Sequence, residues 1–237
     1  MYIGRSVIWQ SILLVPEECK ENTNMKGRLT NMKKIDLKKE LKHLYSPSAR
    51  NIVAIEVPEF NFLMIDGKGD PNLSKEYRDA IEALYSVSYT LKFSIKKEDG
   101  IDYSVMPLEG LWWMEDMKRF TIDNKDEWLW TMMIMQPEYV TKTKASTAIK
   151  AVAEKKDLPA LPRMRFEQYS EGFVVQVLYI GPYSAEGTVI MKMHEYARQS
   201  GCELHGKHHE IYLGDPRKAA PEKLKTVLRQ PVKKIKA

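Results

Sequence analysis

Hydrophobic and polar residues follow one order twice along residues 50–235. Alternating segments, which are typical of strands, precede one longer segment with helical spacing, and two more strand-like segments close the unit. In the first unit the predicted strands and helix are 52–57, 60–66, helix 75–95, 105–114 and 128–136. In the second they are 163–169, 173–180, helix 185–199, 204–213 and 225–232. We therefore predict a duplication.

The repeat predicts an α+β fold of duplicated strand–helix–strand–strand modules, with an antiparallel sheet, helices on one face and a ligand groove between the halves. Module one covers about residues 50–140, a connector 141–162, and module two about 163–235. We expect the first two strands of each module to form a hairpin. Residues 1–31 lack sustained periodicity, so they are predicted to be a leader, disordered or a non-native extension, before a domain at 32–237.

Composition narrows the class of protein. Mean hydropathy is −0.43, and no apolar run approaches the roughly 20 residues that a membrane span needs. The net charge of +5 comes from basic residues mixed with acidic ones, which indicates a solvated surface rather than a nucleic-acid interface. With only Cys19 and Cys202, a disulfide framework is excluded and a reducing compartment is favoured. We therefore expect a cytoplasmic protein with neither a membrane nor a nucleic-acid partner.

The strand around Glu210 carries the main candidate chemistry. Alternation places Glu210 and Tyr212 on one face and Ile211 and Leu213 on the other. An unpaired buried carboxylate is costly, so Glu210 must meet a polar partner, a ligand or a cleft. We expect Ile211 and Leu213 to pack against the helices, which would leave Glu210 facing the groove. A structural salt bridge is the alternative.

Four of the five tryptophans lie in two neighbouring predicted strands. They are Trp112, Trp113, Trp128 and Trp130. Each alone is best explained by core packing, but four together could form an aromatic cage for a flat ligand. If Glu109 occupies the same position in its module as Glu210, then Trp113 faces the groove and Trp112 packs under the helices.

Histidines near Glu210 suggest a metal site at first sight. His208 shares a face with Glu210, but His209 points to the other, and zinc requires three converging ligands. We predict neither a metal nor a cofactor. His208 could still help to polarise a substrate.

The segments Tyr179-Ile180-Gly181-Pro182-Tyr183 and Glu210 to Val232 resemble the GyrI-like small-molecule-binding family. The resemblance covers about residues 33–235. It implies a groove that binds planar, apolar or cationic drugs, with Glu210 facing it and Tyr183 near its mouth. Tyr179 is a further candidate ligand contact.

The segment Pro107-Leu108-Glu109-Gly110-Leu111-Trp112-Trp113 is similar to a stand-alone subgroup, the cyclopropanoid cyclopropyl hydrolases. That resemblance implies a xenobiotic-detoxifying enzyme that opens a strained ring, with Glu210 and Tyr212 catalytic. Two alternatives remain open: a protein that sequesters or senses drugs without chemistry, and an adaptor that masks a macromolecular partner.

Overall fold

The computed structural model describes residues 32–117 and 122–235, and its elements follow the predicted order. The strands are β1 (Lys33–Ile35), β2 (Val53–Val57), β3 (Phe60–Lys68), β4 (Ile101–Tyr103), β5 (Leu108–Trp113), β6 (Leu129–Gln136), β7 (Arg165–Tyr169), β8 (Gly172–Ile180), β9 (Cys202–Leu204), β10 (His208–Tyr212) and β11 (Lys225–Lys234). The α-helices are α1 (Leu37–Glu40), α2 (Lys42–Tyr45), α3 (Lys75–Asp99), α4 (Lys142–Ala153) and α5 (Gly187–Gln199). The predicted leader lies outside the described residues.

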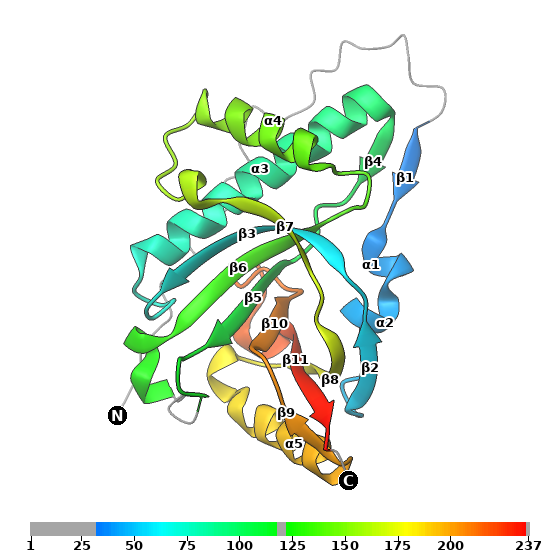
Figure 1. The fold of residues 1–237 in the computed structure, drawn as a ribbon, viewed down its shortest axis with the longest axis vertical. Coiled ribbons are helices and arrows are strands. Elements are labelled where there is room, and N and C mark those ends of the chain that lie inside the picture. The colour runs from blue at the N-terminus through cyan, green and yellow to red at the C-terminus, as the bar shows by residue number, and fades with distance from the viewer. Residues whose placement is uncertain (1–31, 118–121, 236–237) are drawn as a thin grey trace.

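Helix α3 follows from clear start and stop signals. The Ser74 side chain accepts a hydrogen bond from the backbone N–H of Tyr77, and Gly100 ends the helix with a left-handed φ of 69°. Its buried side chains recur at helical spacing and pack against β3 and β6. Helix α4 packs beside α3, and α5 covers the other end of the sheet (Figure 1).

The large antiparallel sheet runs β2-β8-β11-β10-β5-β6-β3-β7, with β9 added to β11. The α+β prediction is therefore confirmed, but the two predicted hairpins are wrong. Strand β2 pairs with β8, and β3 pairs with β6 and β7, so each module lends its first strand to the other. Alternation of apolar and polar residues predicts a strand but not the strand with which it pairs. The exchange of first strands connects the two modules through backbone hydrogen bonds.

Helices α3 and α5 cover the same face of this sheet, which we call the helical face. Tyr77 of α3 packs on Trp112 of β5, and Met193 of α5 shares a buried cluster with Leu228 of β11. Glu210 pairs with Leu228 of β11 on one side and with Gly110 of β5 on the other. Paired residues share a face of the sheet, and so do residues two apart in a strand, so Glu210, Leu228 and Trp112 all lie on the helical face. The expectation that Ile211 faces these helices is therefore wrong.

Candidate functional site

The centre of the helical face is occupied by polar side chains of β10. Register pairs His208 with Trp112, Glu210 with Gly110 and Tyr212 with Leu108. All three β10 side chains therefore project between the packing sites of α3 and α5. We call this group, together with Glu186 described below, the Glu210 site.

Glu210 is held by its neighbours on the strand. The Tyr212 hydroxyl donates a hydrogen bond to Glu210 Oε2 over 2.8 Å and accepts one from Trp112 Nε1 over 3.1 Å. The His208 Nε2 atom lies 3.3 Å from Glu210 Oε1. The Glu210 side chain is 17% exposed, so it is reachable from outside.

Aromatic rings surround this carboxyl group on the side of α3. The ring of Tyr77 lies 6.0 Å from Trp112 and 5.4 Å from Trp130, and Trp128 lies 5.7 Å from Trp112. Trp112 and Trp130 are buried, whereas Trp128 is partly exposed. A Cβ atom at Gly110 would lie 2.8 Å from Trp112 Nε1, so the glycine gives the indole room to reach Tyr212.

The junction between β8 and α5 supplies two further tyrosines. Tyr183 meets Tyr212 edge to face, with ring centroids 5.7 Å apart, and is partly exposed. Tyr179 instead turns its hydroxyl back to donate to the carbonyl of Pro182 over 3.0 Å. Tyr183 thus borders the Glu210 site, while Tyr179 supports the turn.

Glu186, at the start of α5, is a second carboxyl group in this site. It is 4% exposed, and its Oε1 atom has no hydrogen-bond partner among the described residues. Burial, followed by the negative charge of Glu210, raises the pKa of Glu186 to about 9, while the nearby Thr226 side chain opposes the shift. Glu186 therefore keeps its proton at neutral pH.

Two histidines complete the site on the side of α5. His208 is 3% exposed, and neither of its ring nitrogens makes a hydrogen bond within the described part of the chain. The Nε2 atom of His194 in α5 is also buried without a partner there. Burial, and then the positive charges that His208 and Arg198 can carry, lower the pKa of His194 to about 4. His194 is therefore neutral at pH 7.

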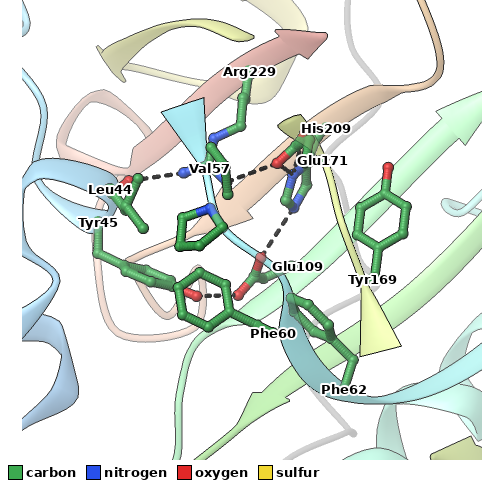
Figure 2. A pocket seen from close by; sticks show the side chains of 11 residues that line it. Leu44, Tyr45, Val57, Phe60, Phe62, Glu109, Tyr169, Glu171, His209 and Arg229 are labelled. Carbon is green, nitrogen blue, oxygen red and sulfur yellow. Dashed lines mark hydrogen bonds and ion pairs between the residues drawn. The ribbon is translucent and has the colours of Figure 1, made fainter. Parts of the chain in front are cut away.

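The opposite face of the same strands holds a buried charge network (Figure 2). His209 Nε2 lies 3.0 Å from Glu109 Oε2 and its Nδ1 lies 2.9 Å from Glu171 Oε1. Arg229 also bonds Glu171, over 2.9 Å, and the Tyr45 hydroxyl donates to Glu109 over 2.8 Å. These residues line a small pocket together with Phe60, Phe62 and Tyr169.

Opposite charges set the proton states of this network. The carboxylates of Glu171 and Glu109 overcome the desolvation of His209 and raise its pKa to about 9. His209 and Arg229 in turn overcome burial and lower the pKa of Glu171 to about 2. The network pairs two cations, His209 and Arg229, with two acidic residues, Glu109 and Glu171. These ion pairs connect residues of both modules.

Trp112 packs under α3 against Tyr77, as predicted, but the predicted grouping of Trp113 with Glu210 is wrong. Glu109 opposes Ile211, which places Glu109 and Trp113 on the face opposite to Glu210. Trp113 there lies under Lys207, whose Nζ is 3.3 Å from the ring centroid. Glu210 pairs with Gly110 and not with Glu109, so Glu109 and Glu210 do not occupy matching positions in the two modules. A one-residue shift in a strand exchanges the two faces.

The comparisons with known proteins agree with this architecture. Residues 50–233 match the model of the GyrI-like small molecule binding domain. The chain belongs to the GyrI-like family. A search of the curated proteins found no match.

Three solved structures from Listeria innocua are similar to this GyrI-like chain. An uncharacterized conserved protein is 44% identical, with a TM-score of 0.78, and 84% of this chain covers all of that one. A hydrolase encoded by lin2189 is 42% identical, with a TM-score of 0.76, and 85% of this chain covers all of it. Another hydrolase is 40% identical, with a TM-score of 0.73 and coverage of 84% of this chain and 100% of that one.

The GyrI-like fold thus brings together most of the residues selected from the sequence. Glu210, Tyr212 and His208 meet Trp112, Trp128, Trp130 and Tyr183 on the helical face, and Tyr179 lies beside them. Glu109 and Trp113 do not join this group. Sequence reasoning missed Glu186 and His194, which carry no local signal of burial. Tyr77 has the helical spacing of a buried residue, but that spacing does not show that it meets Trp112.

Two further results concern classes of function. Within residues 32–117 and 122–235, no cluster of three His, Cys, Asp or Glu side chains could hold a metal ion. Among the helices of the same residues, none has the length and apolar character needed to cross a membrane.

Proposed function

We propose that this GyrI-like protein binds flat hydrophobic xenobiotics at the Glu210 site and hydrolyses a strained cyclopropane ring in them. The observation that carries the proposal is the pair of carboxyl groups, Glu186 and Glu210, in one aromatic-walled site. Glu186 keeps its proton at neutral pH, because burial and then the negative charge of Glu210 raise its pKa. Two carboxyl groups with different proton states are the usual equipment of acid–base hydrolysis. The hydrolase names of two similar Listeria proteins also support it.

The aromatic residues of the site suit a flat ligand. Trp128, Tyr183 and Tyr212 are partly exposed and can stack on it, while buried Trp112 and Trp130 support them from below. Each stacking contact of this kind is worth about 0.5–1.5 kcal/mol beyond the area that it buries. Such a site would hold the ligand and keep bulk water from competing with the reacting water.

The unpartnered polar atoms give a second reason to place a ligand here. Glu186 Oε1, His194 Nε2 and both ring nitrogens of His208 are buried without hydrogen bonds from the described residues. Each such atom costs about 1–3 kcal/mol, so folded proteins rarely keep several together. A substrate with polar groups, and the water that attacks it, would satisfy them.

The reaction that fits is opening of a cyclopropane joined to a conjugated dienone. Water attacks the strained methylene carbon, and a new C–O bond forms as the C–C bond of the ring breaks. The released electron pair moves into the dienone and makes it a phenolate, whose oxygen takes the proton of Glu186. Activation of the water requires Glu210, and the Tyr212 hydroxyl stabilises developing charge. The net change is addition of one water, and aromatisation supplies driving force.

The test incubates the protein with a spirocyclopropyl cyclohexadienone in water enriched in oxygen-18. Mass spectrometry then follows the hydroxyethyl phenol that carries the label. Glu210→Gln keeps the shape of the side chain, so it should still bind the dienone while turnover falls by about 10²-fold or more. Glu203→Gln, an exposed substitution on β9, is the matched control and should turn over like the wild type.

Three results would count against the proposal. Stoichiometric binding without labelled product from the wild type would make this a drug-sequestering protein. Full turnover by Glu210→Gln would remove Glu210 from the chemistry. Absence of both binding and product would remove this class of ligand altogether.

A further inference from the structure

His208 is the most unusual side chain of the Glu210 site that the reaction above leaves without a role. It lies on β10 opposite Trp112, with Gln230 of β11 on its other side, because His209 pairs with Arg229. The imidazole is 3% exposed, and both ring nitrogens lack hydrogen bonds from the described residues. A structural histidine usually has these atoms satisfied, and His209, one position along the strand, hydrogen-bonds Glu171 through Nδ1 and forms an ion pair with Glu109 through Nε2.

The position of Glu210 fixes which nitrogen of His208 can react. Nε2 lies 3.3 Å from Glu210 Oε1, close enough to become a hydrogen bond when a substrate closes the site. A carboxylate beside one ring nitrogen favours the tautomer with the proton on that nitrogen, and leaves the other nitrogen as a base. The base is then Nδ1, which has no partner now.

The charges around His208 suit the uptake of one proton. Glu210, on the same strand, would offset the imidazolium that forms. Helix α5 presents His194, which is neutral at pH 7, with Arg198 acting on His194 from the same helix. From β11, Gln230 contributes an amide whose Nε2 donates to two backbone carbonyls. The group that faces His208 most closely is therefore the carboxylate.

We propose that Nδ1 of His208 accepts the proton of the attacking water, and that Glu210 is a positioning residue that holds the imidazole in the Nε2–H tautomer. The O–H bond of water breaks toward Nδ1 as the oxygen bonds to the strained methylene carbon. Glu186 gives its proton to the new phenolate oxygen. The imidazolium afterwards loses its proton to solvent, and Glu186 regains one, so the site returns to its starting state. This inference rests on the proposed hydrolysis and names its base.

The first test uses variants and the spirocyclopropyl cyclohexadienone. His208→Gln should still bind the dienone, while its single-turnover rate falls by about 10²–10⁴-fold. His208→Ala should be rescued by added imidazoles, and the rescued rate should rise with the basicity of the imidazole. A histidine that only fills space would be rescued according to size instead. His205→Gln, exposed in the loop before β10, is the matched control and should retain the wild-type rate.

The second test needs no variant and covers the case in which these do not fold. Nitrogen-15 NMR of histidine-labelled wild type, saturated with the ring-opened phenol, should show His208 protonated at Nε2 and bare at Nδ1. A proton on Nδ1 in that complex would overturn the inference. So would wild-type turnover by His208→Gln, although hydrolysis itself would stand. No labelled product from the wild type would overturn the inference and the hydrolysis together.

Discussion

Replacing Glu186 by glutamine should stabilise the protein, increasingly so as the pH rises. The carboxyl group has a pKa of about 9 in the folded chain, against a reference value of 4.5. A group whose folded pKa is raised contributes most below its unfolded pKa, and that contribution is lost as the pH climbs through the folded value. Folding at neutral pH therefore requires Glu186 to take up a proton that the unfolded chain does not hold.

The size of this effect follows from the pKa change. Each pH unit above 4.5 costs about 1.4 kcal/mol of stability until the pH nears the folded pKa, which is about 3 kcal/mol at pH 7. Glutamine has nearly the same shape and no charge to lose, so it removes this cost. We expect Glu186→Gln to match the wild type near pH 4.5 and to exceed it by about 2–3 kcal/mol at pH 7.

Urea unfolding followed by tryptophan fluorescence at pH 5, 7 and 8.5 measures the difference. Glu222→Gln, at an exposed position, serves as the control and should track the wild type at every pH. A stability difference between Glu186→Gln and wild type that stays constant with pH would refute the reasoning. The same variant should lose turnover, because it has no acidic proton to donate.

Two other predictions concern the two faces of the sheet. His209→Gln leaves Glu109 and Glu171 with one cation, Arg229, in place of two, and should lower the unfolding free energy by about 3–5 kcal/mol in urea unfolding at pH 6. Because the pKa of His209 is raised to about 9, its stabilisation is fully present below pH 6.5 and is lost as the pH rises through 9, so the deficit should shrink at pH 10; a constant deficit would contradict this. Trp128→Ala should weaken binding of a flat aromatic ligand by about 1–3 kcal/mol in a fluorescence titration. Trp113→Ala, on the opposite face, should leave the affinity unchanged, and equal effects of the two would return Trp128 to a purely structural role.

Residue patterns were sufficient to predict the elements, but not how the strands pair. The alternation in β2 and β3 and the helical spacing in α3 appear in the fold close to their predicted bounds. The turn between β2 and β3 looked like a hairpin because it is short and contains Pro58. It instead carries the chain from β2, at one edge of the sheet, to β3, the strand next to the opposite edge. Pairing of distant strands depends on how both modules close around the core, which a local pattern does not encode.

The candidate site shows the same division between local and tertiary information. Glu210 and Tyr212 could be predicted because alternation along one strand fixes their common face. The relation between β5 and β10 could not, since it depends on register, and an offset of one residue predicts Trp113 instead of Trp112 beside Glu210. Glu186 acquires its raised pKa only from burial and from a charge on another strand, so its own neighbours in the sequence do not reveal it.

Strand β10 shows how one segment can serve both folding and chemistry. His209 turns toward Glu109 and Glu171 and forms ion pairs with both carboxylates, which join the two modules. His208, one position earlier, turns the other way and keeps two buried nitrogens without hydrogen bonds from the described residues. The cost of leaving such atoms unsatisfied must be met by stability gained elsewhere. The network behind the strand is the natural source, because it stabilises the same backbone that holds His208 and Glu210 in place.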